Sequence, residues 1–494
     1  MKEFHLNYQI QLFVSILMVK HMMGIDEFRV NAHLLVDWMA DYLDQIEHLP
    51  VKSQVKPGEI LAQLPKLPPL EREPIETIIR DFQEIILPGI THWQSPNFFS
   101  YFPANSSYAS VLAEMLTATL GAQCMIWDTS PAAAELEERV MIWLREMLDL
   151  PSHFNGVIQD TASSATLCAI LSAREKVSNY STNNQGLPHQ NYRVYCSTQT
   201  HSSIDKAVRI AGIGQDNLLK IEVDKNLAMD VSALEKQIKT DLEKGKKPLC
   251  VIATLGTTGT TAIDPLSEIS ELCQAFDIWL HVDAAYAGTA LILPEFRWMG
   301  EGLEHADSFV FNPHKWMFTN FDCSAYFVKD KEVLIRTFEI LPEYLKTKSG
   351  DRVNNYRDWG IALGRRFRAL KLWFVIRDFG VKGIQNRIRE HISYAQTLQQ
   401  EIKTRNDLEM LAPVVLNLIC FRFKPEGVTD EFHLNKLNEK LLHTLNSTGK
   451  IYLTHTKINN TYTIRMVMGQ TYLKLEHVQK AWKLVCETAA GLMA

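Results

Sequence analysis

The 494-residue sequence lacks the patterns that would assign it to several large classes of protein. Its eight cysteines are scattered without a CxxC pair, so we expect neither a zinc site nor a disulfide framework, and a reducing cytoplasm is the simplest compartment. The net charge of −6, without any block of basic residues, argues against nucleic acid as a partner. No repeat, low-complexity segment or long linker interrupts the chain.

Long apolar runs are missing as well. The one segment that could be taken for a targeting signal, residues 10–19 (IQLFVSILMV), is too short to cross a bilayer. A signal peptide would also need a basic start and a small-residue cleavage site, which this segment lacks. We therefore expect no membrane partner and interpret residues 1–23 as an N-terminal extension, with Met22 or Met23 as the functional start.

What the sequence does contain is an alternation of apolar and amphipathic segments. Hydrophobic residues make up 46% and charged residues 22% of the chain, as in globular proteins, and the length suggests two to four domains of about 150 residues. Short apolar runs predict buried strands at 193–197, 249–255, 278–282 and 308–311, and helices are predicted at 231–243 and 265–276. This order is typical of an α/β protein with a mostly parallel central sheet.

The two ends of the chain show other patterns. The first part predicts helices at 25–48 and 76–86, separated by an irregular segment rich in proline. Residues 363–376 (LGRRFRALKLWFVI) are predicted to form a long helix that begins with a basic cluster. After it, helices alternate with short strands such as 418–423 and 462–467, which predicts a small α+β terminal domain.

A carboxylate and a lysine follow two successive predicted strands. The run 278–282 stops at Asp283, and in open α/β sheets ligands bind outside the carboxyl ends of the strands. The run 308–311 leads into Asn-Pro-His-Lys-Trp, where apolar neighbours would lower the pKa of Lys315 and make it a candidate for a covalent bond to an aldehyde. Singly, Asp283 would be a turn residue and Lys315 a surface lysine. Pyridoxal phosphate (PLP) needs both a lysine for its aldehyde and a carboxylate for its ring nitrogen, so together they predict this cofactor.

The surrounding motifs resemble those of one enzyme family. HVDAAYAG, PEFR, ADSF, FNPHKW and NFDCSA are similar to the group II PLP-dependent decarboxylases, and most closely to the aromatic L-amino-acid decarboxylase family. The resemblance continues through THWQSPNFFSYFP, QTHSS, ATLGTT and LGRRFRALKLWFV, so that it covers the chain from about residue 24 onward.

This resemblance implies a fold and an assembly. The expected fold is that of the PLP-dependent transferases of the aspartate aminotransferase type (fold type I), an α/β class. After the extension, the expected parts are an N-terminal helical arm (24–107), a large PLP-binding domain (108–370) and a small α+β C-terminal domain (371–494). Because the arm packs on a partner subunit in the family, a homodimer with the site at its interface is implied.

The resemblance also implies site residues. His201 is expected to stack on the cofactor ring, and Tyr344, in the polar segment 340–350, to return a proton from a surface loop that closes over the site. Glycine at 364 leaves room for a large aromatic ring, where serine favours histidine or phenolic side chains. The implied catalytic residues are Lys315, Tyr344, His201 and Asp283; the cofactor contacts are Lys315, Asp283, His201, Thr161, Ala162, Ser163, Thr258, Ala285, Asn312 and His314; the substrate contacts are Trp93, Tyr101, Met125 and Gly364; no metal is implied.

Some of these residues also have a purely structural explanation. Residues 161–163 begin a predicted helix, where free backbone N–H groups and hydroxyls suit a phosphate but also serve as an ordinary cap. His201 could be a capping or core histidine. The aromatic residues of the loop 91–108 could form a core patch between domains or a wall for a flat substrate.

The chain departs from the family at several site positions. Residues 160–164 read DTASS where members commonly have GSASE, which keeps the hydroxyls but loses the glutamate. Ala104 stands where animal members have a threonine near the substrate carboxylate, and Gln123 and Met125 stand where the partner-subunit wall often has isoleucine and phenylalanine. We expect a pocket that is more polar at one point and less rigid at another. The loop that carries Tyr344 is also shorter than in animal members.

The predicted function is the decarboxylation of an aromatic L-amino acid to its amine and CO2, with tryptophan, Dopa, tyrosine and phenylalanine as open alternatives. An aldehyde synthase of the same fold is the nearest rival, and Tyr344 argues against it because those enzymes carry phenylalanine at this position. An aminotransferase would call for a carboxylate-clamping arginine that the motifs do not supply. A non-catalytic binding protein on this fold is the rival of another class, and the presence of Lys315, Asp283 and His201 counts against it.

Overall fold

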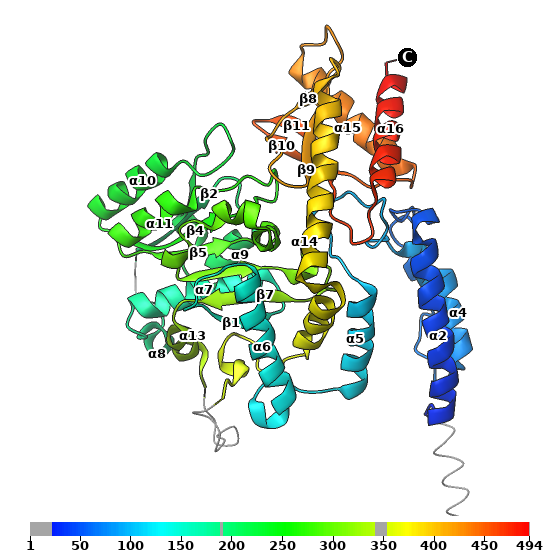
Figure 1. Ribbon diagram of the computed structural model, residues 1–494, viewed down its shortest axis with the longest axis horizontal. Helices are drawn as coiled ribbons and strands as arrows, with labels where there is room; N and C mark the ends of the chain where they lie inside the picture. The colour runs from blue at the N-terminus through cyan, green and yellow to red at the C-terminus, as the bar shows by residue number, and fades with distance from the viewer. Residues whose placement is uncertain (1–21, 188–190, 341–352, 494) are drawn as a thin grey trace, which may run out of the picture.

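The computed structural model describes residues 22–187, 191–340 and 353–493. Figure 1 shows a large α/β body, a smaller sheet-containing part above it, and helices α2 (Ile25–Gln45) and α4 (Ile75–Asp81) lying side by side at the edge of the molecule. In the described part of the chain, no helix combines the length and the apolar composition that a membrane span requires.

The body is built on a seven-stranded sheet with the strand order β1-β7-β6-β5-β4-β2-β3. Strand β7 is antiparallel to both of its neighbours, and the remaining pairs are parallel. The strands are β1 (Asn155–Gln159), β2 (Tyr192–Ser197), β3 (Leu218–Ile221), β4 (Lys247–Thr254), β5 (Trp279–Asp283), β6 (Ser308–Phe311) and β7 (Ser324–Val328). The predicted α/β class with a mostly parallel sheet is therefore confirmed.

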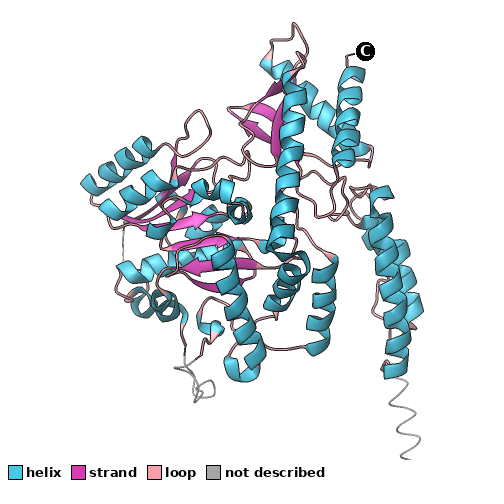
Figure 2. Cartoon of the chain, viewed as in Figure 1, coloured by secondary structure: helices cyan, strands magenta, loops and turns pink. Residues whose placement is uncertain are grey.

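Helices cover this sheet (Figure 2), and that cover explains the apolar runs in the sequence. Every residue of β5, β6 and β7 is buried, as expected for strands with both faces covered. Three helices of the body begin with a side chain that accepts a backbone N–H: Thr161, Asp230 and Asp330. The helices are α6 (Pro131–Met147), α7 (Ala162–Val177), α8 (Thr182–Gln185), α9 (Ser203–Ile210), α10 (Val231–Glu243), α11 (Leu266–Ala275), α12 (Pro313–Trp316) and α13 (Lys331–Phe338).

The smaller part has a four-stranded antiparallel sheet in the order β10-β11-β9-β8. Its elements are β8 (Leu408–Met410), β9 (Leu418–Phe423), β10 (Thr454–Ile458), β11 (Thr461–Val467), α15 (Glu431–Ser447) and α16 (Leu475–Gly491). Side chains of β9, β11, α15 and α16 form one hydrophobic cluster together with Phe99, Ala395, Leu398 and Ile402. Helix α14 (Arg368–Lys403) joins the body to this part, with a non-helical residue at Gly380. The domain limits stay a prediction, and the one drawn at residue 370 falls in the first turn of α14.

The predicted long helix at 363–376 is wrong at its start, because α14 begins at Arg368. The backbone of Arg365 bonds to another segment: its N–H donates to Gln123 Oε1 (2.7 Å) and its carbonyl accepts the Cys124 N–H (3.0 Å). Its guanidinium is buried against Glu137. The leading arginines therefore have a structural role in an irregular segment, and these tertiary contacts override helix propensity.

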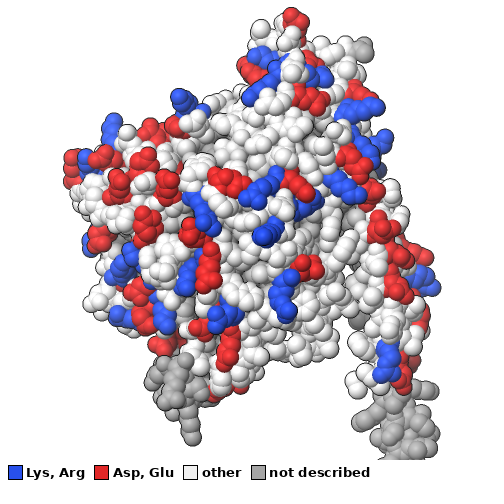
Figure 3. Space-filling view, viewed as in Figure 1, with Lys and Arg blue, Asp and Glu red and all other residues white. Residues whose placement is uncertain are grey.

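The predicted helices at 25–48 and 76–86 are confirmed, and the limits of the N-terminal arm stay a prediction. Helix α2 continues as a short 3₁₀ turn (Ile46–His48), and α4 continues as a π-helical turn (Phe82–Ile86). The irregular segment between them contains the short α3 (Glu59–Gln63). Helix α5 (Tyr108–Leu120) follows the aromatic loop and begins with a capping box at Ser107. Charged side chains of both signs are interspersed over the face that Figure 3 shows.

Candidate functional site

A cavity of about 260 Å³ lies at the edge of the large sheet where β1, β2, β4, β5 and β6 end. Ligands in open α/β sheets bind at this edge. The cavity is lined by all the residues that the sequence predicts as cofactor contacts, namely Thr161, Ala162, Ser163, His201, Thr258, Asp283, Ala285, Asn312, His314 and Lys315. The structure thus brings these residues together, and their individual roles stay predictions.

Lys315 reaches this cavity from the short helix α12 that follows β6. Its Nζ lies 5.7 Å from the centre of the Phe102 ring, and its backbone N–H donates to the Asn312 carbonyl (2.9 Å). Burial lowers the pKa of Lys315, and the charge of Asp283 opposes part of that shift. The neutral amine is therefore available at a lower pH than in an ordinary lysine, which suits a nucleophile for a carbonyl group.

Asp283 is the last residue of β5 and is 5% exposed. Its Oδ1 accepts the N–H of Ala285 (3.0 Å), which holds the carboxylate at the strand end. The sheet register places Asp283 beside Thr254 of β4 and Val310 of β6. A carboxylate fixed in this way can hold a proton on the ring nitrogen of a pyridine.

The turn between β1 and α7 supplies hydroxyls and backbone N–H groups to the same cavity. Thr161 caps α7, because its Oγ1 accepts the Ser164 N–H (3.4 Å). Asp160, where the family has glycine, accepts the Thr161 N–H at Oδ1 (2.7 Å). The capping role of Thr161 is therefore shown, and a phosphate at this helix start stays a prediction.

Two histidines line the cavity beside Lys315. His314 is buried, and its Nδ1 accepts the N–H of Cys323 (2.9 Å). Burial, and then the charge of Lys315, lower the pKa of His314 to about 3. The same two causes lower the pKa of His201. Both rings are therefore neutral near pH 7, so that Lys315 does not face an added positive charge.

The sequence analysis missed five residues of this cavity: Phe102, Ser203, Thr254, Gly256 and Tyr286. Phe102 stacks on Tyr286 with ring centres 3.8 Å apart, although the two lie in different segments of the chain. Gly256 did carry a signal, since it opens a Gly-Thr-Thr-Gly turn. Its φ is +84°, and a Cβ there would approach Ala287 Cβ to 2.5 Å, so the turn requires glycine.

Arg465 of β11 is a further residue that the sequence analysis missed. It is 4% exposed, and its guanidinium donates to the carbonyls of Thr258 (2.8 Å) and Gly259 (2.9 Å) and to Thr454 Oγ1 (2.9 Å). The smaller part of the chain thereby fixes the turn that carries Thr258 into the cavity. An arginine in a predicted strand gives no sign in the sequence that it will contact this turn.

The predicted substrate residues do not line this cavity within the single chain. Trp93 and Tyr101 stack on each other with ring centres 5.6 Å apart and are 37% and 46% exposed. Met125 and Gly364 lie on two segments that are joined by the hydrogen bond from the Arg365 N–H to Gln123 Oε1. A Cβ on Gly364 would lie 3.3 Å from Gln123 Nε2. Tyr344 and the loop predicted around it lie outside the described residues.

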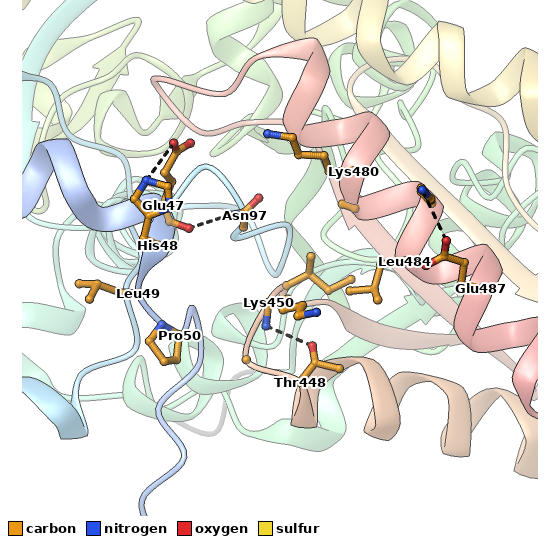
Figure 4. Close-up of a pocket in the computed structure, with 14 residues that line it drawn as sticks. Glu47, His48, Leu49, Pro50, Asn97, Thr448, Lys450, Lys480, Leu484 and Glu487 are labelled. Carbon is orange, nitrogen blue, oxygen red and sulfur yellow. Dashed lines mark hydrogen bonds and ion pairs between the residues drawn. The ribbon is translucent and has the colours of Figure 1, made fainter.

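A second cavity, of about 510 Å³, lies between the end of the arm and α16 (Figure 4). Its acidic side chains already have partners: Glu47 is 2.9 Å from His477 Nε2, and Glu487 is 3.7 Å from Lys483 Nζ. None of the predicted site residues lines it. The predicted cofactor contacts lie in the cavity at the sheet edge and not in this one.

Comparison with known proteins identifies the family of the chain. Residues 57–424 match the model of the pyridoxal-dependent decarboxylase conserved domain. Tyrosine decarboxylase 4 of Petroselinum crispum is 43% identical over 482 residues, which is 95% of this chain and 94% of that protein. Phenylacetaldehyde synthase of a Rosa hybrid cultivar is 41% identical over 95% of both chains. The crystal structure of Catharanthus roseus tryptophan decarboxylase in complex with L-tryptophan has a TM-score of 0.89 and 39% identity, covering 95% of this chain and 99% of that one.

The fold and the cavity define an α/β enzyme of the PLP-dependent fold type I class. The chain belongs to the pyridoxal-dependent decarboxylase family, in the branch that contains the plant tyrosine and tryptophan decarboxylases, and it is a carboxy-lyase that uses PLP.

The donors in the cavity fit this cofactor. The lysine amine can bond to the aldehyde of PLP, and the buried carboxylate can pair with its protonated ring nitrogen. The N–H groups at the start of α7 can bind its phosphate.

Proposed function

We propose that this protein decarboxylates an aromatic L-amino acid to the amine and CO2. The observation that carries the proposal is the single cavity in which Lys315, Asp283 and His201 meet at the carboxyl ends of the strands. The substrate class is supported by the similarity to tyrosine and tryptophan decarboxylases over almost the whole chain.

Each residue has a proposed task in this reaction. When bound, PLP accepts the electron pair that the departing carboxylate leaves behind. Lys315 would hold the cofactor covalently and release it to the substrate amine, and Asp283 would keep a proton on the ring nitrogen. His201 would stack on the cofactor ring. Tyr344 returns a proton to the α-carbon, because a phenol can donate one.

The proposed substrate wall is aromatic. Trp93 and Tyr101 belong to a cluster with Phe98 and Tyr452, and the Tyr101 hydroxyl is 3.3 Å from that of Tyr452. Tyr101 has a φ of +51°, a strained conformation for a non-glycine residue that concentrates at functional sites. A flat ring is the ligand that such a wall accepts. In a dimer, Met125 and Gly364 would complete the wall from the other subunit.

We propose a homodimer in which the arm and α5 form the interface. An apolar groove of about 350 Å³ runs between the two helices, lined by Met39 and Leu43 of α2 and Leu112 and Met115 of α5, among others. In this chain α2 has one buried described residue, Asn31, and the exposed apolar side chains on both helices are those of an unfilled contact surface.

A charge in the groove tests the dimer. We expect Leu112→Glu, at a side chain that is 54% exposed here, to produce monomers at micromolar concentration, because the dimer would bury an unpaired carboxylate. Light scattering after size exclusion measures the mass. The matched control is Leu242→Glu, at a side chain that is 44% exposed on α10, and it should remain dimeric; Figure 1 shows α10 at the opposite edge of the molecule from α2 and α5. A monomeric wild type, or a dimeric L112E, would contradict the proposal.

We further propose a reducing compartment, the cytoplasm. All eight cysteines are free, and seven of them are buried, where desolvation raises the pKa of thiols such as Cys168 and Cys323. Buried protonated thiols are poor nucleophiles, so these cysteines behave as small apolar residues.

A product assay tests the activity. The protein loaded with PLP is offered tryptophan, Dopa, tyrosine, phenylalanine, histidine and glutamate, and amine and aldehyde are measured separately by mass spectrometry. We expect an aromatic amine as the main product, with kcat/KM at least about tenfold higher for an aromatic acid than for glutamate, a difference of ~1.4 kcal/mol.

Two outcomes would contradict this expectation. Aldehyde with peroxide would make the protein an aldehyde synthase, the second candidate, which the similarity to phenylacetaldehyde synthase supports and Tyr344 opposes. Absence of any product from a chain that binds PLP would indicate a binding protein on this fold.

A further inference from the structure

His201 occupies the turn that leads into α9, and its imidazole makes defined contacts there. Its Nδ1 accepts the backbone N–H of Ser203 (3.1 Å) and lies 2.9 Å from Ser203 Oγ. A ring nitrogen that accepts a backbone N–H cannot carry a proton itself. In the neutral ring the proton must therefore be on the other nitrogen, Nε2.

Burial and the neighbouring charges together favour the neutral state of His201. Lys315 in the cavity acts to lower its pKa, and Asp283 and Asp205, on β5 and α9, act in the opposite sense. Partial burial is the largest cause and also lowers it. The balance is a pKa below the ordinary value for histidine, so the ring is neutral at pH 7.

We propose that Ser203 is a positioning residue that acts through both of its donors: its backbone N–H keeps the proton of the neutral His201 ring on Nε2, and its hydroxyl bonds to Nδ1 in either protonation state, so that His201 donates a hydrogen bond from Nε2 and does not transfer a proton during turnover. The inference deepens the proposed function, on which its second half rests. The tautomer itself follows from contacts within this chain alone.

The geometry gives the physical reason. If Nε2 gave its proton away, the neutral ring would have to hold its proton on Nδ1, directly facing the Ser203 N–H, and two donors would oppose each other. The Ser203 hydroxyl could turn to accept that proton, but the backbone N–H cannot. Proton return to the α-carbon is thereby left to another group, such as the phenol of Tyr344.

The two donors of Ser203 can be separated by substitution. Ser203→Ala removes the hydroxyl and keeps the backbone N–H. In this variant the Nδ1–H of the protonated ring has lost the hydroxyl that accepted it. The Nδ1 of the neutral ring still accepts the backbone N–H of residue 203. Because a hydrogen bond to a charged group is worth more than one to a neutral group, the midpoint of His201 protonation should move down by about half to one pH unit.

The test is nitrogen NMR of the full-length protein with labelled histidine, in its PLP-loaded form, with His201→Gln used to assign the signal. The expected result at pH 7.5 is a protonated Nε2 and an unprotonated, hydrogen-bonded Nδ1. On titration toward acid, Ser203→Ala should shift the midpoint downward, and Ser202→Ala, one residue away, should leave it unchanged. A proton on Nδ1 at pH 7.5, or equal midpoints in wild type and S203A, would overturn the proposal.

A kinetic measurement tests the second half. If His201 only donates a hydrogen bond from Nε2, His201→Gln, whose side-chain amide reaches the position of Nε2, should keep more activity than His201→Leu by about tenfold or more. Equal loss in both variants would overturn the donor role. This arm requires turnover and the NMR arm does not, so a protein with the expected tautomer but without product would refute the proposed function and leave the tautomer standing.

Discussion

Replacement of Lys315 by alanine is expected to lower kcat/KM by roughly three orders of magnitude or more, because the chain loses its covalent attachment to the cofactor. The lowered pKa of this lysine makes its neutral amine available for that bond at a lower pH than in an ordinary lysine. The measurement is the mass of the protein after borohydride treatment in the presence of PLP. Wild type should gain the mass of the reduced cofactor at Lys315, and K315A should not.

Two further variants make this result specific. Asp283→Asn should still gain the cofactor mass, because Lys315 is intact, and yet lose roughly 10²-fold or more in kcat, because its side chain no longer holds the charge of the ring nitrogen. Lys329→Ala, at an exposed lysine, should behave like wild type. Retained labelling and activity in K315A would refute the assignment of Lys315. An unchanged kcat in D283N would refute only the assignment of Asp283.

Replacement of Glu137 by alanine is expected to cost ~3–5 kcal/mol of unfolding free energy. Glu137 and Arg365 form a two-pronged ion pair (2.6 and 3.0 Å) in which both side chains are less than a tenth exposed. The same two side chains bond to the backbone N–H and carbonyl of Ile158, on the strand that leads to the cavity. Alanine would leave a buried guanidinium without its carboxylate.

Urea unfolding followed by tryptophan fluorescence, at fixed protein and PLP concentrations, measures this loss. The matched control is Glu235→Ala, which breaks the exposed pair between Glu235 and Lys239 on α10 (2.6 Å) and should cost less than about 0.5 kcal/mol. A loss in E137A no greater than in E235A would show that the buried pair does not stabilise the fold.

The fold was largely predictable where burial imposes one pattern. The bounds predicted for β6 (308–311), β9 (418–423) and α10 (231–243) coincide with those of the structure. A strand covered on both faces must be apolar throughout, and the apolar residues of a half-buried helix must repeat about every 3.6 residues, so each leaves a recognisable pattern in the sequence. The start of α14 left none, because Arg365 is held by Glu137 and by residues far away in the chain.

The site was predictable to the extent that its residues follow strands. Asp283, Asn312 and Lys315 could be placed because parallel strands end at one edge of a sheet. Phe102 and Arg465 could not, because each reaches the site across the fold, from the aromatic loop and from β11. Their side chains are also common in cores and ion pairs, so residue type carried no signal.

By itself, the sequence determined the α/β class and the cofactor, and it placed the lysine and the carboxylate that are predicted to serve it, because side chains that follow a strand end are neighbours in the sequence. The tertiary structure alone decided which distant side chains close the cavity, such as Phe102 stacked on Tyr286, and which nitrogen of His201 is free. Those features depend on distances between segments, and the packing of the whole chain sets such distances.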